Sequence, residues 1–232
     1  MKPIAQINWD AVYAGLNQSG YAMIPDVLSK SECHQISQSY QSQSIFRSTI
    51  SMERYRFGKG EYKYFSYPLP QVVQDIRSSW YPSLSLLANQ WNESLSIDFH
   101  YPSDHESFLQ NCQQKNQLRP TPLLLKYEPR GFNTLHQDLY GEIYFPFQVM
   151  LLLTQPGEDH AGGEFVLTEQ VPRAQSKAMV VSPVQGDAVI FATNFRPVKG
   201  SKGYYRARFR HGISEVKSGT RYALGIIFHD AA

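Results

Sequence analysis

Hydrophobic residues are spaced differently in the two halves of this chain of 232 residues. Up to about residue 118 most of them recur every three or four positions, which predicts amphipathic helices. Ser29 and Glu32 are placed as in a capping box and mark the start of one helix. Two short apolar runs in this half, Tyr21 to Ile24 and Ile45 to Met52, predict strands. The predicted helices span Trp9 to Leu16, Ser29 to Tyr40, Gln71 to Trp80, Leu84 to Leu95 (separated from the previous one by Tyr81-Pro82) and Asp104 to Asn116.

From residue 119 onwards, short apolar runs are separated by Gly, Pro and Asn turns. Runs of this length and punctuation are typical of a β-sandwich or barrel of jelly-roll type. The predicted strands are Pro122 to Tyr127, Thr134 to Asp138, Pro146 to Thr154, Glu164 to Thr168, Ala178 to Ser182, Ala188 to Thr193, Arg208 to Ser214 and Arg221 to Phe228.

The change of spacing divides the chain into a helix-rich part, residues 1–118, and a β-rich part, residues 119–232. The last strand indicates that both parts form one structural unit. Neither of its faces carries a charge after Arg221, so both should be covered. The N-terminal helices are the natural cover for the outer face, which holds alternate residues from Tyr222 to Phe228.

Composition adds few constraints. Hydrophobic residues make up 42% of the sequence, charged residues 18%, and the net charge is +2, which gives no electrostatic argument for nucleic acid or membrane. Cys33 and Cys112 are far apart and neither has a CxxC partner, so we expect reduced, buried thiols. The sequence shows no signal segment and no window long enough to span a membrane, so we expect a soluble, cytoplasmic protein.

The first candidate site is His136-Gln137-Asp138, within a predicted strand. Because side chains alternate along a strand, His136 and Asp138 would share one face and Gln137 would point to the other. A divalent metal accepts an imidazole and a carboxylate, and a second histidine would complete the two-histidine, one-carboxylate set of Fe(II) oxygenases. By itself the pair is a weak signal, because it arises by chance in roughly 30% of chains of this size.

His211 is the best candidate for the second histidine, because it lies on a predicted strand of the β-rich part. We expect His160 in a glycine-rich turn and His229 at the frayed chain end. A lone histidine is more often an ordinary surface or core residue. Arg221 follows His211 by ten residues and opens the last strand on its inner face. A buried guanidinium there could bind a carboxylate ligand or pair with a structural acid.

These residues together resemble the prolyl-hydroxylase-like branch of the Fe(II)/2-oxoglutarate dioxygenases, over roughly residues 120–230. As a set they are a strong signal, although each piece is weak. The matching elements are Tyr127, Gly131, His136, Asp138, Gly162-Gly163-Glu164-Phe165, Gly186 to Phe191, His211-Gly212 and Arg221.

The resemblance implies a double-stranded β-helix, a jelly roll packed against the N-terminal helices, with iron held by His136, Asp138 and His211. It also implies that 2-oxoglutarate forms a salt bridge with Arg221 and a hydrogen bond with Tyr127, and that dioxygen is the other cosubstrate. The interval from His211 to Arg221 fits this branch; AlkB-type DNA dealkylases have a longer interval and a second arginine.

The whole chain also resembles a group of bacterial oxygenases sometimes described as acting on damaged nucleic acid. The matching stretches are Gly60 to Phe65, Arg119 to Leu125, Leu135 to Glu142, Gly163 to Gln170 and Leu224 to Asp230.

We therefore expect a 2-oxoglutarate-dependent dioxygenase that hydroxylates a protein or amino-acid substrate and converts 2-oxoglutarate to succinate and CO2. One alternative is oxidative demethylation or repair of damaged nucleic acid. Another, from a different class, is a non-catalytic jelly-roll binding module. The intact set of four site residues favours an enzyme, because a decayed site need not keep them all.

Several segments are candidates for substrate contact. Arg54 to Phe65 interleaves cations and aromatics, which could stack bases and contact phosphates or could bind a peptide. The segment could instead be a solvated edge strand or loop with its aromatics on the core side. Arg206, Arg208 and Arg210 alternate opposite to His211 and should be solvated, with a phosphate contact as the alternative. Asn133 and Tyr140 are candidate pocket residues, and Arg196 is expected on a loop that could close over the mouth.

Overall fold

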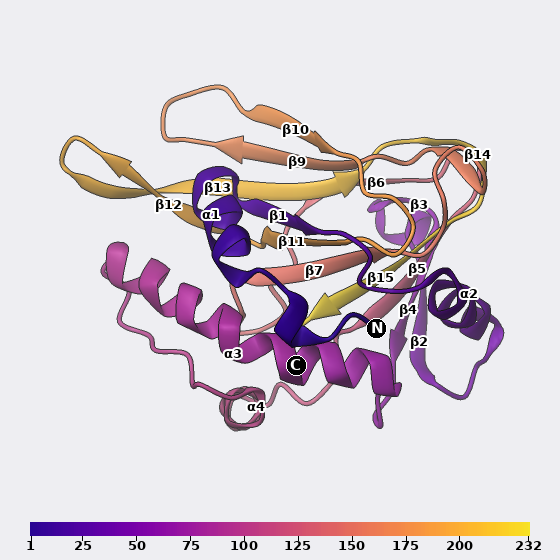
Figure 1. Cartoon of the computed structure of the whole chain (residues 1–232), viewed down its shortest axis with the longest axis horizontal. Helices are drawn as coiled ribbons and strands as arrows, with labels where there is room; N and C mark the ends of the chain where they lie inside the picture. Colours follow the sequence, from indigo (N-terminus) through magenta and orange to yellow (C-terminus); the bar gives the residue numbers. More distant parts are fainter.

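Two antiparallel β-sheets face each other in the computed structural model, which describes all residues, 1–232 (Figure 1). The seven-stranded sheet has the order β1 (Tyr21–Ile24), β11 (Ala188–Ala192), β7 (Phe147–Leu152), β15 (Arg221–Ile227), β5 (Leu123–Tyr127), β4 (Glu61–Phe65) and β2 (Phe46–Ser51). The six-stranded sheet has the order β10 (Lys177–Val181), β9 (Phe165–Gln170), β13 (Gly203–Ile213), β6 (Phe132–His136) and β3 (Gly58–Lys59), with β12 (Phe195–Gly200) also paired to β13. A separate ribbon joins β14 (Val216–Gly219) to β8 (His160–Gly162).

This arrangement confirms the predicted jelly roll. Each of the eight predicted strands of the β-rich part corresponds to a strand of the structure. Three further strands of that part, β8, β12 and β14, were not predicted, because they lie in segments rich in glycine and charge that show no apolar alternation.

The N-terminal residues contribute more β-structure than their helical spacing predicts. β1 pairs with β11, β4 lies between β5 and β2, and β3 pairs with β6, so residues 21–65 extend both sheets. The sequence predicted β1 and β2, whereas β3 and β4 lie in Arg54 to Phe65, for which an edge strand was only one of the alternatives. Cations alternate with aromatics there, so the apolar face is short and mixed.

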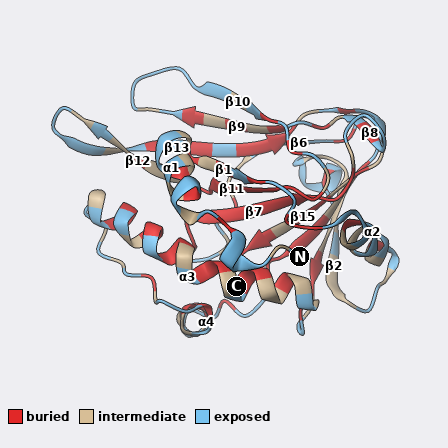
Figure 2. Ribbon diagram, viewed as in Figure 1, coloured by how far each residue is buried: buried red, intermediate tan, exposed pale blue.

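Helices cover the outer face of the seven-stranded sheet, on the side shown below it in Figure 1. The long helix α3 packs Trp80, Leu84 and Trp91 into the same hydrophobic cluster as the outward residues of β7 and β15. Figure 2 shows this buried layer as red along the strands and along one side of α3. The four α-helices are α1 (Trp9–Ser19), α2 (Lys30–Gln38), α3 (Gln71–Ser94) and α4 (His105–Gln114), and none is long and apolar enough to cross a membrane.

The predicted break at Tyr81-Pro82 is wrong, because α3 runs without interruption through Pro82. A proline inside a helix loses one backbone hydrogen bond and costs about 3 kcal/mol. The helix has a long buried face on both sides of that position, including Trp80 and Leu84. Burial of each such side chain is worth roughly 1.5–3 kcal/mol, so packing on the sheet outweighs the proline.

Two further expectations concern a helix start and the thiols. Ser29 and Glu32 form the predicted capping box at the start of α2. Cys33 and Cys112 are free and buried, as predicted, and burial raises the pKa of each thiol to about 11. Gly20 ends α1 in the left-handed conformation, where a Cβ atom would collide with the ring of Phe209.

The inner face of the seven-stranded sheet faces the space between the sheets. In β15, alternate residues from Tyr222 to Phe228 pack under the helices, whereas Arg221 and Ala223 point inward, as the alternation predicted. In β7, Phe147, Val149 and Leu151 join the outer cluster. Their neighbours along the strand therefore point into the interior, where the candidate site lies.

Candidate active site

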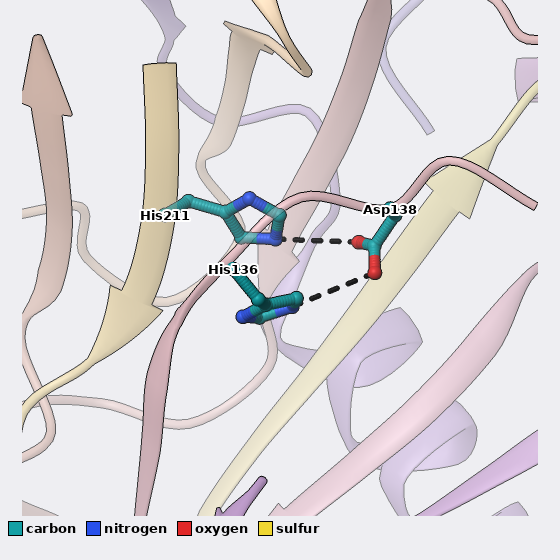
Figure 3. A group of neighbouring side chains, drawn as sticks. All are labelled: His136, Asp138 and His211. Atoms are coloured by element: carbon teal, nitrogen blue, oxygen red, sulfur yellow. Dashed lines mark ion pairs between the residues drawn. The ribbon is translucent and has the colours of Figure 1, made fainter. Parts of the chain in front are cut away.

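His136, Asp138 and His211 converge at one point between the two sheets (Figure 3). β6 and β13 pair with His136 directly opposite His211, and the two ring centroids are 4.2 Å apart. The Asp138 Oδ1 atom lies 3.5 Å from His136 Nε2, and Oδ2 lies 3.3 Å from His211 Nε2. One ligand atom from each residue lies within 4.8 Å of the others.

The path of the chain at this site differs from the prediction. β6 ends at His136, so Asp138 lies in the loop that follows and not on the strand. The side chain of Gln137 still points away, and its amide donates to the backbone oxygen of Phe209 at 2.7 Å and to Oδ1 of Asn194 at 2.9 Å. These bonds fix the loop and so hold the two flanking ligand candidates on the same side.

Two hydrogen bonds orient the candidate ligands. His136 Nδ1 lies 2.7 Å from the backbone oxygen of Thr134, so Nδ1 carries the proton and Nε2 keeps its lone pair. The hydroxyl of Tyr140 donates to Asp138 Oδ1 at 2.5 Å. Nothing in the sequence marked Tyr140 as a partner of Asp138, although its proximity along the chain made it a candidate pocket residue.

Burial and neighbouring charges shift the pKa of Asp138 and of His211. Burial alone would raise the pKa of Asp138, but the hydrogen bond from His211 and the charges of both histidines hold it well below the ordinary value. Burial lowers the pKa of His211, and His136 lowers it further. An ionised carboxylate and two imidazoles thus lie together, a donor set that fits Fe(II).

Arg221 is almost fully buried, with 1% of its surface exposed, and forms no salt bridge. Its Nε and Nη1 atoms have no hydrogen-bond partner, and burial lowers its pKa to about 10. The guanidinium lies 5.8 Å from the ring of Tyr127, whose buried hydroxyl is also without a partner. The alternative of a structural acid paired with Arg221 is therefore not observed. An anion with hydrogen-bonding oxygens fits these unsatisfied groups, as a carboxylate of 2-oxoglutarate would.

Gly163 makes room for the Arg221 side chain. Its φ is +70°, and a Cβ atom there would lie 2.7 Å from Arg221 Cδ and 2.9 Å from Val216 Cγ2. Only glycine combines this backbone conformation with that approach. The Gly162-Gly163 pair, which the sequence showed only as part of a family pattern, thus has a physical role next to the candidate anion site.

A cavity of about 210 Å³ contains all of these groups. The two histidines, Asp138 and Arg221 line it, and most of the remaining wall is apolar or aromatic. Asn133 and Tyr140 line it too, as predicted. Concave, mainly apolar cavities with a few convergent polar groups are the usual form of small-molecule sites.

Other predicted positions lie elsewhere. The expectation that Arg196 lies on a mobile mouth loop is wrong: it belongs to β12, where its Nη2 pairs with Glu169 Oε1 at 2.6 Å and Nη1 donates to the backbone oxygen of Asn17 at 2.8 Å. His160 lies on β8 instead of in a turn. His229 is fully buried instead of frayed, and its Nδ1 accepts from the backbone N–H of Phe145. Neither histidine joins the cluster.

The segment Arg54 to Phe65 combines the two predicted alternatives. Tyr64 and Phe65 in β4 are buried, as expected of a strand with aromatics on the core side. Tyr55 and Phe57 are exposed instead, and their rings stack with centroids 5.6 Å apart. Phe57 also lines the cavity, so this exposed pair lies at its mouth.

The arginines of β13 are exposed as predicted. Arg206, Arg208 and Arg210 alternate with buried residues and form no salt bridge, and the guanidinium of Arg206 lies over the ring of Phe195. They lie on the face of the sheet opposite to His211, away from the cavity.

The fold is that of the 2-oxoglutarate-Fe(II) oxygenases. An oxygenase of that family from Burkholderia pseudomallei superposes with a TM-score of 0.57 at 13% identity, covering 98% of this chain and 93% of the other. A prolyl-4-hydroxylase from Pseudomonas putida gives 0.54 at 14% identity, covering 97% and 99%. A prolyl hydroxylase from Trichoplax adhaerens, in complex with a peptide fragment of hypoxia inducible factor, gives 0.54 at 16%, covering 94% and 87%.

Sequence comparison identifies the family within that class. Residues 60–231 match the model of a family described as an oxygenase catalysing oxidative methylation of damaged DNA. Uncharacterised proteins from two strains of Mycobacterium tuberculosis are 44% identical over 168 residues, 72% of this chain and 72% of theirs. The chain belongs to this oxygenase family. It is therefore an enzyme and not a non-catalytic binding module, and its class implies Fe(II), 2-oxoglutarate and dioxygen as cofactor and cosubstrates.

Proposed function

We propose that the protein is an Fe(II)- and 2-oxoglutarate-dependent dioxygenase in which His136, Asp138 and His211 hold the metal and Arg221 holds the distal carboxylate of 2-oxoglutarate. The observation that carries this assignment is the unpaired, buried guanidinium of Arg221 in the same cavity as the three donors. A buried cation without a partner is unfavourable unless a ligand supplies the anion. Tyr127, opposite Arg221 in the strand register, donates its free hydroxyl to the same carboxylate.

The residues of the chain bind and orient, and the bound metal with its cosubstrates supplies the oxidative decarboxylation of 2-oxoglutarate to succinate and CO2 that is coupled to hydroxylation. Thr134 fixes the tautomer of His136, and Tyr140 fixes the carboxylate of Asp138. The apolar walls exclude water from the reacting groups.

For the substrate that is hydroxylated, we propose an amino-acid side chain, free or within a peptide. The cavity of about 210 Å³ must hold 2-oxoglutarate as well as the reacting carbon. That volume is below the roughly 300–1,000 Å³ of sites that enclose drug-sized ligands. A small apolar side chain is compatible with the remaining space and its lining. The peptide complex of the Trichoplax adhaerens enzyme is a precedent for such a substrate on this fold.

A damaged nucleic acid is the second candidate. The description of the family favours it, and so does the exposed Tyr55–Phe57 stack at the mouth, where Arg54 lies over the Tyr55 ring. Aromatic stacks beside cations are typical of surfaces that bind single-stranded nucleic acid.

The test combines an anaerobic visible spectrum with an assay of succinate formation. Anaerobic addition of Fe(II) and 2-oxoglutarate should produce a weak visible charge-transfer band, and succinate should form once oxygen is admitted. His136→Ala and Asp138→Ala should each abolish iron-dependent turnover; an active variant of either would disprove the metal assignment. Stimulation of succinate formation by amino acids or peptides, compared with alkylated single-stranded DNA, then separates the two substrate candidates. Salt-dependent DNA binding would support the second.

A further inference from the structure

Gln148 is a polar residue on the inner face of β7 that none of the interactions described above uses. Its exposed fraction is 4%, and it lines the cavity. Its side-chain Nε2 has no hydrogen-bond partner. An amide that is buried without a partner costs about 1–3 kcal/mol. It is therefore, like the Arg221 guanidinium and the Tyr127 hydroxyl, a buried group whose partner is missing from the chain itself.

Strand register places Gln148 at the opposite end of the cavity from Arg221. Arg221 lies opposite Tyr127 at the start of β15, whereas Gln148 lies opposite Ile227 at its end. Six residues of strand separate the two positions along β15, or roughly 20 Å of backbone. The unpaired polar groups thus fall into two separate sets, one at each end.

Phe191 connects the Gln148 end of the cavity to the cluster of His136, Asp138 and His211. Gln148 is the cross-strand partner of Phe191, and the Phe191 ring lies 4.7 Å from the ring of His211, centroid to centroid. Directly opposite side chains on paired strands are neighbours. A molecule held by Gln148 would therefore lie beside the cluster, on the side away from Arg221.

We propose that Gln148 anchors the hydroxylated substrate by donating its amide N–H to a backbone oxygen of that substrate, either the carboxylate of a free amino acid or the carbonyl of a peptide. This inference rests on the proposed function, because Arg221 must be occupied by 2-oxoglutarate for the Gln148 end to be left for the substrate. The polar backbone of the substrate is then fixed at one point, and its apolar side chain extends along the apolar wall toward the metal donors. The distance from Gln148 to the cluster selects which carbon is hydroxylated.

The chemistry of the surrounding wall supports a ligand of this kind. Gly225 lines the cavity opposite Met150, two residues along β7 from Gln148, and Leu123 lines it opposite Gly225 on β5. A Cβ atom on Gly225 would come within 2.8 Å of Leu123 Cδ2. The missing side chain makes room for Leu123, so an apolar side chain forms the wall at this point. An acceptor oxygen with an aliphatic side chain satisfies the amide and the apolar wall together.

The experiment compares Gln148→Leu with the wild-type enzyme. Succinate formation is measured with Fe(II), 2-oxoglutarate and the common L-amino acids, each free and as its N-acetyl amide, which mimics a peptide unit. For whichever substrate stimulates the wild type, Gln148→Leu should raise KM by about 10- to 100-fold. The dissociation constant for 2-oxoglutarate, from calorimetric titration, should stay within about twofold. Gln170→Leu, the same change at the exposed last residue of β9, is the matched control and should behave as wild type.

Two additional readouts test whether Gln148 has a structural role and which oxygen of the ligand it binds. Because Gln148→Leu removes an unsatisfied amide from the interior, its Tm should be unchanged or higher by about 2–4 °C. Gln148→Glu should raise the KM for free amino acids more than the KM for their blocked amides if Gln148 binds the carboxylate. It should raise both equally if Gln148 binds a carbonyl.

Each contrary result has one meaning. A wild-type KM in Gln148→Leu, or a Tm lowered by several degrees, overturns the role of Gln148. Failure of every amino acid and every blocked amide to stimulate a wild-type enzyme that binds 2-oxoglutarate also overturns it, while the oxygenase assignment stands. Failure of the wild type to bind 2-oxoglutarate removes the proposed function itself.

Discussion

Two buried arginines in this protein have opposite surroundings. Arg77 in α3, with no exposed surface, donates from Nε to the backbone oxygen of Ile227 at 2.8 Å and from Nη2 to Phe228 at 3.0 Å. It also pairs with Asp230 Oδ1 at 2.8 Å. Arg221, at 1% exposure, has no acid partner and two unpaired guanidinium nitrogens. Arg77, beneath the seven-stranded sheet, thus has hydrogen-bond partners within the protein. Arg221, between the sheets, has none for two of its nitrogens.

The difference separates a structural cation from a ligand-binding one. Arg77 joins α3 to the end of β15 and to the C-terminal residues, so its bonds are part of the folded structure. Arg221 contributes no bond of that kind, and its desolvation is offset only when an anion binds. Burial alone does not distinguish the two; the inventory of hydrogen-bond partners does.

The largest effect is expected at the structural arginine. Arg77→Met would remove the only cation paired with the buried carboxylate of Asp230, leaving it the Tyr67 hydroxyl as donor, and would remove the bonds to the backbone oxygens of Ile227 and Phe228. The free energy of unfolding should fall by about 3–5 kcal/mol. Thermal unfolding should show a Tm lower by roughly 10 °C. Arg208→Met, at an exposed position, is the control and should leave the Tm within a degree or two; an equally stable Arg77 variant would contradict the comparison.

Two buried histidines, His105 and His229, make the stability depend on pH. Burial first, and then the charge of Arg77, lower the pKa of both His105 and His229 to about 3. As the pH falls below the ordinary value of about 6.5, the unfolded chain takes up protons that the folded chain refuses, so stability falls with pH between about 6.5 and 3. Each histidine accounts for about 1.4 kcal/mol per pH unit in that window, or roughly 2 kcal/mol at pH 5.

His105→Gln should therefore reduce the slope of unfolding free energy against pH between pH 6 and 5, measured by urea unfolding, by about 1.4 kcal/mol per unit. His34→Gln, at an exposed position of α2, should leave that slope unchanged. An unchanged slope in the His105 variant would show that His105 is not held neutral.

The smallest effect on stability is expected at the ligand-binding arginine. Arg221→Met removes a buried charge that has no partner, so the free energy of unfolding should stay within about 1 kcal/mol of the wild-type value or rise. The same urea unfolding measurement applies, without added 2-oxoglutarate. A loss comparable to that of Arg77→Met would mean that Arg221 stabilises the fold through contacts of its own.

Much of the β-rich architecture could be predicted from sequence, because its strands alternate or form short apolar runs between turn residues. Three of the site residues could be predicted for a related reason: His136, His211 and Arg221 lie on or at the start of strands whose alternation was visible. β4 and the uninterrupted α3 could not be predicted locally. In both, packing determined the conformation, despite the low strand propensity of the charged residues in β4 and the low helix propensity of Pro82 in α3.

Other parts of the site depend on register and on side-chain contacts, which sequence spacing does not encode. That His136 faces His211 follows from the pairing of β6 with β13. The position of Gln148 opposite Ile227 arises in the same way. The Tyr140 bond to Asp138 is a side-chain contact within the loop after β6. Gln148 reads in the sequence as a polar interruption of an apolar strand, and only its burial without a partner shows that it is exceptional.

The most direct test of the account is calorimetric titration of 2-oxoglutarate into anaerobic, Fe(II)-loaded protein, comparing the wild type with Arg221→Met and Arg221→Lys. The account predicts that Arg221→Met weakens binding by about 100-fold or more, since a buried charge-assisted pair is worth roughly 3 kcal/mol, and that Arg221→Lys restores part of it. The protein should remain folded in each case. Wild-type affinity in a folded Arg221→Met variant would contradict the account, because the unpaired cation would then not be the anchor of the cosubstrate.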